Sequence, residues 1–104
     1  MNYAPKPEVE AVITLLPKGE SSRTKPLNWS INGYFGCPMV LPSGNWDCRI
    51  IFPSETAPIE LGSTTIGQLQ FLSPGAVLPQ IKVGTEFRLW DVGIFAYGRV
   101  IKLL

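Results

Sequence analysis

The sequence predicts a small all-β protein, a closed antiparallel Greek-key barrel of six to seven short strands. The 104 residues include 10 glycines and 10 prolines, which interrupt the chain too often for long helices. Hydrophobic residues make up 45% and the net charge is +1, which is typical of a packed core and not of a disordered chain. Short alternating segments separated by turn residues indicate a barrel or sandwich. A chain of this length forms one domain.

The first predicted strand covers residues 8–16, at the start of a barrel domain over residues 8–104. Residues 1–7 carry two prolines and form an extended N-terminal segment. In residues 8–16, Val9, Ala11, Ile13 and Leu15 alternate with the intervening side chains, which is the period of a strand. A helix beginning after Pro7 is the alternative, because proline is favourable at the first helical position.

Further short strands follow a polar loop at residues 17–25 and an irregular stretch that continues to Gly36. Proline and glycine at residues 42–45 predict a turn between the next two strands. The Ser-Pro-Gly run at residues 73–75 ends a later strand. The predicted segments are 37–41, 47–52, 59–62 (a brief strand or a bulge), 65–72, 80–83, 87–90 and 95–104.

The side-chain inventory argues against catalysis and against a cofactor or metal. The chain has no histidine, which excludes Ser-His-Asp and Cys-His catalysis within it and removes the commonest zinc ligand. Cys37 and Cys48 fit no zinc or CxxC spacing. They are either reduced thiols on neighbouring strands or a disulfide. We therefore expect a protein that is not an enzyme.

The location expected from the sequence is the cytoplasm. The N-terminus begins with Met and lacks the apolar core of a signal peptide. Two uncharged runs, at residues 26–46 and 61–81, are long enough to cross a bilayer, but both contain prolines and polar amides. Neither run satisfies its backbone as one helix in lipid, so no membrane partner is expected.

The C-terminal residues 84–93 and 98–102 form the most patterned block, and they predict a hairpin. Gly84 permits a positive φ, Asp91 and Gly93 form the turn, and Gly98 permits close backbone approach. This block resembles the last hairpin of the third domain of elongation factor Tu. That family has Gly-x-x-Phe-x-Ile-x-Glu-x-Gly, a short segment, then Gly-x-Val and a closing lysine.

The resemblance extends over nearly the whole chain through short motifs. Residues 8–16 resemble the opening strand of that domain, and Arg23-Thr24-Lys25-Pro26 resembles the Arg-x-x-Pro element of its polar loop. Gly33-Tyr34 stands where the family has Gly-Tyr. The chain departs from the family after Gly93, where Ile94-Phe95 replaces a usual arginine. A phosphate-binding Gly-x-x-x-x-Gly-Lys-Ser/Thr motif is absent, so GTP binding in the family manner is not expected.

The resemblance implies a non-catalytic recognition module, since this barrel serves as a docking surface in the family. The partner is expected to be another protein, and one version of this hypothesis is a small bacterial regulatory or immunity-type protein. Large apolar side chains at loop tips favour a protein partner. The candidate partner-binding residues are Trp46 after the turn at 43–45, Ile94 and Phe95 after the last turn, Trp29, and Arg23 and Lys25 at the rim.

The alternative hypothesis is an RNA-binding module that contacts tRNA-like stems through a basic loop. Lys18, Arg23 and Lys25 supply the loop cations, although Glu20 lies among them and a solvated loop is the simpler interpretation. Arg88, Arg99 and Lys102 extend this surface only if strand alternation places them on one side. The tryptophans with Tyr34 and Tyr97 would stack bases, or else pack in the core and at its rim.

Overall fold

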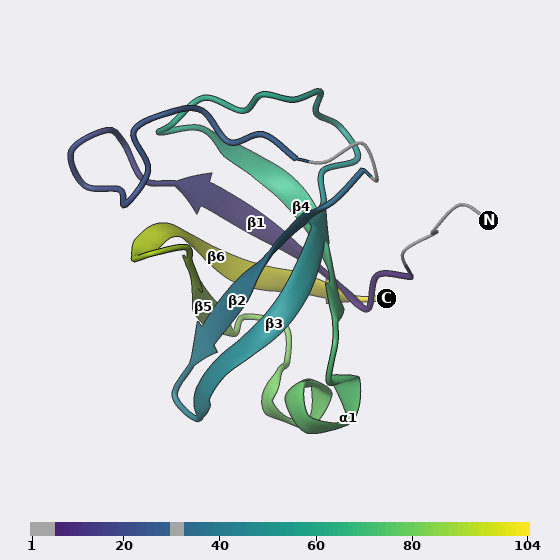
Figure 1. Cartoon of the computed structure of the whole chain (residues 1–104). Coiled ribbons are helices and arrows are strands. Elements are labelled where there is room, and N and C mark those ends of the chain that lie inside the picture. The colour runs from purple at the N-terminus through teal and green to yellow at the C-terminus, as the bar shows by residue number, and fades with distance from the viewer. Residues whose placement is uncertain (1–5, 30–32) are drawn as a thin grey trace.

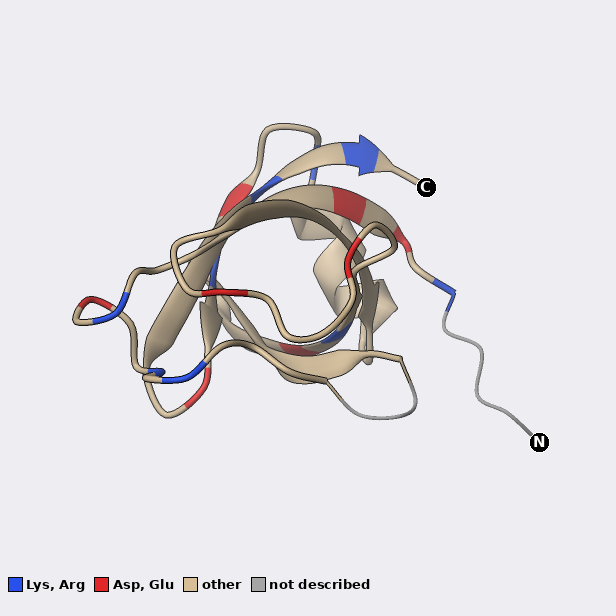
Figure 2. Ribbon diagram, turned by 90° about the horizontal axis from the view of Figure 1, so that it is seen from above, with Lys and Arg blue, Asp and Glu red and all other residues tan. Residues whose placement is uncertain are grey.

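The computed structural model describes residues 6–29 and 33–104, and it shows a closed antiparallel barrel (Figure 1). Neighbouring strands follow one another around the barrel in the order β1-β4-β3-β2-β5-β6, and β6 closes the ring on β1. Seen from above, the strands enclose a ring (Figure 2). The strands are β1 (Val9–Leu15), β2 (Phe35–Leu41), β3 (Gly44–Ile51), β4 (Thr64–Phe71), β5 (Glu86–Trp90) and β6 (Ile94–Leu103).

The strand order makes this barrel a Greek key. β2, β3 and β4 are consecutive antiparallel neighbours, and β5 then returns to lie beside β2. This gives the spatial order 4-1-2-3 that defines the motif. The β2–β5 pairing covers only Met39↔Leu89 and Val40↔Arg88, whereas β1 and β6 pair along the whole length of β1. The predicted fold class is therefore confirmed.

Six of the predicted strands correspond to observed ones, but the prediction for residues 80–83 is wrong. The connection between β4 and β5 instead contains a short helix α1 (Pro74–Val77) and a 3-10 helix η1 (Leu78–Gln80). Both have proline in the first turn, where its missing N–H is not needed and its fixed φ favours a helical start. Residues 59–62 contribute only an isolated bridge between Ile59 and Leu27.

Neither helical segment approaches the length of a membrane span. Among the described residues, no helix is long and apolar enough to cross a membrane.

Alternate side chains of each strand fill the barrel interior. In β1 the side chains of Val9, Ala11, Ile13 and Leu15 are fully buried, while those between them are partly exposed. This alternation confirms the strand and not the helical alternative. Among the described residues, no polar or charged side chain is counted in the buried core. The described core is therefore built from aliphatic, aromatic and sulfur-containing side chains.

Two glycines of the C-terminal hairpin behave as the sequence predicts. Gly84 has a φ of +96°, a conformation that favours glycine. Gly98 lies on β6 opposite Phe87, whose ring covers it. A Cβ on Gly98 would lie 2.3 Å from Cζ of Phe87, closer than any real contact. Gly98 therefore makes room for the Phe87 ring inside the barrel.

The two cysteines lie directly opposite one another on β2 and β3. Both are buried and unbridged, and Sγ of Cys48 donates to the carbonyl oxygen of Cys37 at 3.2 Å. Of the two alternatives, the structure has the reduced thiols on neighbouring strands and not the disulfide. A hydrogen bond between the Cys37 and Cys48 side chains, and then burial, raise the pKa of the Cys37 thiol well above its ordinary value. Its thiolate is disfavoured, so Cys37 is a packing residue and a poor nucleophile.

Candidate functional site

The structure corrects the prediction that Trp46 lies at a loop tip. The turn is only Pro42-Ser43, because Gly44 already pairs with Leu41, and β3 therefore begins earlier than predicted. Trp46 lies within β3, partly buried against the core. Its indole Nε1 donates to Oγ of Ser43 at 2.9 Å, which satisfies its polar atom locally. Trp46 is a packing residue at this end of the barrel.

Phe95 is also buried and not exposed, which corrects the second loop-tip prediction. It is fully buried together with Ala96, because the β5–β6 register shifts at this point. Leu89 pairs with Ala96 and Trp90 pairs with Ile94, so Phe95 has no partner on β5 and two successive side chains turn inward. Its ring meets that of Phe35 edge-on, with centroids 5.7 Å apart. Ile94 is partly buried and Lys25 is exposed. Trp29 is partly buried, with its ring centroid 5.2 Å from that of Phe52.

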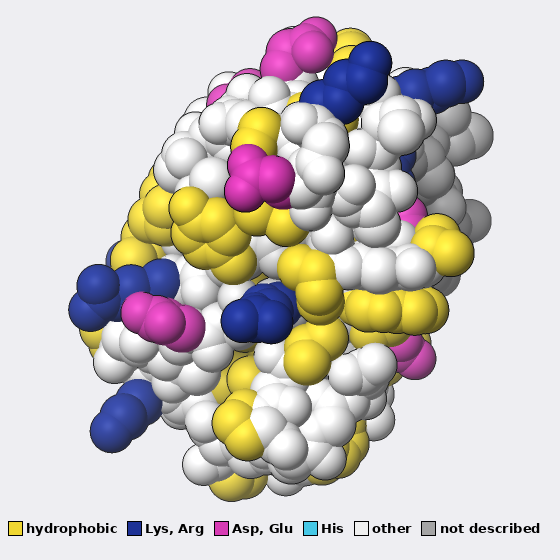
Figure 3. Space-filling model, turned by 90° about the vertical axis from the view of Figure 1, so that its left-hand side faces the viewer, with side chains coloured by type: hydrophobic (Ala, Val, Ile, Leu, Met, Phe, Trp, Pro, Cys, Tyr) yellow, Lys and Arg dark blue, Asp and Glu magenta, His cyan; other side chains and the backbone are white. Residues whose placement is uncertain are grey.

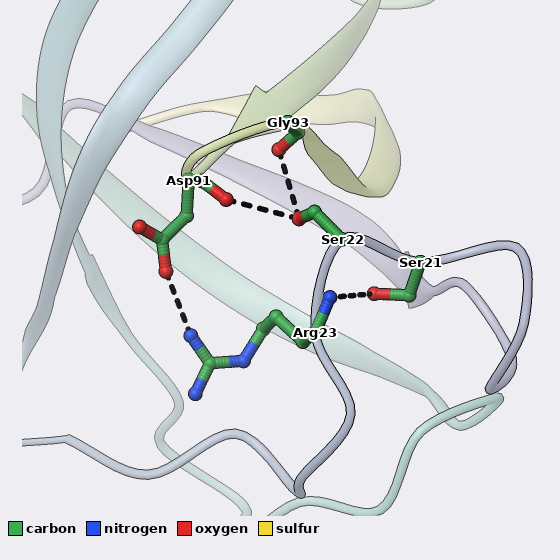
Figure 4. A network of polar contacts seen from close by, with 5 residues as sticks. All are labelled: Ser21, Ser22, Arg23, Asp91 and Gly93. Atoms are coloured by element: carbon green, nitrogen blue, oxygen red, sulfur yellow. Dashed lines mark hydrogen bonds and ion pairs between the residues drawn. The ribbon is translucent and has the colours of Figure 1, made fainter.

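Arg23 joins the polar loop to the β5–β6 turn (Figure 4). Its Nη1 donates to Oδ2 of Asp91 at 2.8 Å, and its side chain is only 21% exposed. The guanidinium carbon lies 5.6 Å from the ring centroid of Phe35 and 5.8 Å from that of Phe95. These are cation–π distances. Arg23 is therefore held by intramolecular contacts, in contrast to the free rim cation that the sequence suggested.

Ser22 strengthens the same connection through its hydroxyl and backbone (Figure 4). Its Oγ lies 2.9 Å from the carbonyl oxygen of Asp91 and 3.0 Å from that of Gly93, within hydrogen-bonding distance of both. Its backbone N–H donates to the carbonyl of Ile94 at 3.0 Å. The loop at residues 17–25 thus fixes the β5–β6 turn and the direction in which β6 leaves it.

An open groove of about 1160 Å³ runs over the outer face of β1, β6 and β5 to the edge of β2. We call it the β5–β6 groove. Figure 3 shows hydrophobic side chains, with basic side chains among them, on the side of the molecule that carries the β5–β6 turn. The apolar part of the lining is mainly aliphatic and includes Val12, Leu16, Val40, Val83, Ile94 and Ile101. Of the six residues predicted as a site, this groove contains Ile94.

Strand register gathers three polar side chains in this groove. Arg88 on β5 lies directly opposite Tyr97 on β6, and Tyr97 lies opposite Thr14 on β1. Arg99 follows Tyr97 by two residues, so it shares the outer face. Opposed Cβ atoms in a sheet are about 4.5–5.5 Å apart and diagonal neighbours about 7–8 Å. Arg88, Tyr97 and Arg99 therefore form one cluster, with Tyr97 beside both cations.

The cluster keeps its positive charge available. Arg88 and Arg99 are exposed, and within the described part of the chain no side-chain hydrogen bond or ion pair engages either guanidinium. Glu86 lies directly opposite Arg99 and also lines the groove, so it offsets part of the charge without pairing at contact distance. Tyr97 is 52% exposed. The arrangement can bind an anionic group next to apolar surface.

Sequence reasoning named Arg88, Arg99 and Tyr97 without deciding which way they face. The missing information is the irregularity between Leu89 and Trp90, where the β5–β6 register shifts. That shift, and not the alternation within either strand, decides which residues of the two strands oppose one another. Lys102, the third cation considered, is exposed and pairs in register with Glu10 on β1.

The described residues offer little for metal or acid–base chemistry. No group of three or more Cys, Asp or Glu side chains among them is arranged to hold a metal ion. Two carboxylates near the start of β1 bond to β4: Glu8, which precedes the strand, accepts the backbone N–H of Phe71 at 2.9 Å, and Glu10 accepts from Gln68 at 3.1 Å.

Comparison with known proteins adds no further candidate. No protein-family model matches the chain, and no curated protein matches it significantly. The functional assignment depends on the geometry of the β5–β6 groove.

Proposed function

We propose that this barrel is a non-catalytic recognition module that binds a segment of a partner protein in the β5–β6 groove. The observation that carries the proposal is an open, mainly aliphatic groove on an otherwise closed barrel, with Arg88 and Arg99 unpaired beside exposed Tyr97. Contiguous apolar surface of this kind on a small protein is typical of interaction sites. A central aromatic and arginines are the side chains that contribute most to protein interfaces.

The chemistry of the groove favours a protein over RNA. Nucleic-acid surfaces stack bases on several aromatic rings and neutralise many phosphates with cations. This groove has one exposed aromatic side chain, Tyr97, among aliphatic ones, and two free arginines. The basic loop is also weakened as an RNA site, because Arg23 is already paired with Asp91. Aliphatic side chains of a partner would remove apolar surface from water here, which favours association.

The resemblance to the third domain of elongation factor Tu supports the same proposal. In that family the barrel docks on other macromolecules and performs no chemistry. A barrel of this kind would act on a partner by occupying a surface, as a small regulatory or immunity-type protein does. The β5–β6 groove includes strands from the block that carries the resemblance, residues 84–102.

A peptide-display selection on the immobilised protein tests the proposal. The library consists of random 16-residue peptides, and selected peptides are measured against Ile101→Asp and Leu103→Asp. Both residues are exposed on β6, but only Ile101 lines the groove, so the two variants add the same charge inside and outside it. We expect Ile101→Asp to lose binding and Leu103→Asp to keep it.

The proposal is wrong if the selected peptides bind both variants as well as they bind the unmodified protein. It is also wrong if no peptide is selected while single-stranded RNA binds at physiological salt. Circular dichroism of both variants shows whether the barrel is intact, so loss of fold is separable from loss of the groove.

A further inference from the structure

We infer that the partner segment is acidic as well as aliphatic, and that a carboxylate of the segment binds at the Arg88–Tyr97–Arg99 cluster. The inference rests on the proposed function and specifies what the groove selects. Both guanidiniums are exposed, and within the described residues neither has a hydrogen-bond or ion-pair partner. An arginine fork matches a carboxylate through two parallel N–H donors.

The spacing of the two arginines suits one carboxylate or two neighbouring ones. Arg88 and Arg99 are diagonal neighbours across the β5–β6 pair, which places the two residues about 7–8 Å apart. Two long side chains at this separation reach the same anionic group from opposite sides. The phenol of Tyr97 lies on the same face, directly opposite Arg88, and adds a neutral donor.

Glu86 makes the electrostatic surroundings of Arg99 different from those of Arg88. It lies opposite Arg99 in the register, whereas the residue opposite Arg88 on the β2 side is the apolar Val40. A carboxylate therefore meets less repulsion on the Arg88 side of the cluster than near Glu86. The flanking Val12 and Ile101 then accept aliphatic side chains of the same segment. The groove thus selects an acidic residue flanked by apolar ones.

Two display libraries of 16-residue peptides test the acidic character of the segment separately from the proposal that the groove binds a protein segment. Both contain the same aliphatic and polar residues, but one carries only Asp and Glu as charged residues and the other only Lys and Arg. We expect the acidic library to give groove binders. Their affinity should fall about tenfold or more in Arg88→Glu/Arg99→Glu, because attraction at two positions becomes repulsion.

The matched control is Lys18→Glu/Lys25→Glu, which changes the net charge equally at two exposed loop positions away from the groove lining. Acidic peptides should lose little affinity for this variant. Glu86→Gln removes the opposing carboxylate and should strengthen their binding severalfold. Arg88→Glu/Arg99→Glu should acquire binders from the basic library, a gain that an unfolded variant does not show.

Three other outcomes would contradict either the acidic segment or protein binding itself. Groove binders from both libraries that are indifferent to Arg88→Glu/Arg99→Glu would refute the acidic partner and leave the protein-binding proposal standing. Absence of any peptide sensitive to Ile101→Asp would refute both. Binding of a labelled 16-nucleotide single-stranded RNA that requires Arg88 and Arg99 would replace the protein assignment with a nucleic-acid surface.

Discussion

Arg23 donates a hydrogen bond of 2.8 Å to Asp91, a residue 68 positions later in the chain. The contact connects the loop after β1 to the turn between β5 and β6, two strands that both line the β5–β6 groove. In a closed barrel, strands that are far apart in the sequence pair with one another. The Arg23–Asp91 ion pair adds a contact of this kind between two loops. The orientation of β6, and with it Tyr97 and Arg99, depends on that turn.

Replacing Arg23 with alanine should lower the free energy of unfolding by about 1–3 kcal/mol. The variant loses a partly exposed ion pair and two cation–π contacts, which are modest individually. Urea denaturation measures the change. Arg23→Lys keeps the charge but loses the planar group, so it should recover only part of the stability. An alanine variant as stable as the original would show that the contacts with Asp91 contribute nothing.

Val92→Gly should stabilise the protein by about 1 kcal/mol. Val92 has a φ of +59°, which a β-branched residue adopts only at a cost, and it is 85% exposed, so little packing is lost. The added freedom of glycine in the unfolded chain offsets part of the gain. Thermal and urea unfolding test this. Val83→Gly is the control, because Val83 is exposed without a positive φ and should lose stability.

Gly98→Ala should destabilise the barrel by about 1–3 kcal/mol. The new methyl group would meet three atoms of the Phe87 ring, which is buried and cannot move freely. The double variant Gly98→Ala/Phe87→Leu should lose less than the two single losses added together, since the smaller side chain removes the clash. Additive losses in a denaturation cycle would contradict direct contact as the cause.

Stability should decline with rising pH in a manner that depends on Cys37. The folded state raises the pKa of this thiol above its unfolded value, so the neutral form is favoured by folding. That contribution is complete below about pH 8.5 and is lost above it, with a slope of at most about 1.4 kcal/mol per pH unit. Urea denaturation in reductant between about pH 7.5 and 9.5 measures the slope. Cys37→Ala should flatten it; identical slopes would exclude the thiol as its source.

Hydrophobic alternation and turn residues were enough to predict the barrel and most of its strands. Val9 to Leu15 alternate strictly and become the buried face of β1. The same pattern failed at residues 80–83, which alternate polar and apolar side chains but pair with no strand: Gln80 ends η1, and Val83 already belongs to the turn before β5. It failed again at Trp46, where the length of the turn, and not the identity of the residue, decides where β3 begins.

By itself the sequence determined the fold class, the positions of the hairpin glycines and the exclusion of histidine-dependent catalysis. These follow from local conformational preference and from which side chains exist at all. Tertiary structure alone decided that Arg23 would be paired and that Phe95 would be buried. It also placed Arg88, Tyr97 and Arg99 together on the outer face. The physical reason is register: side chains from separate strands meet according to how those strands are paired, and a one-residue shift reverses which side chains share a face.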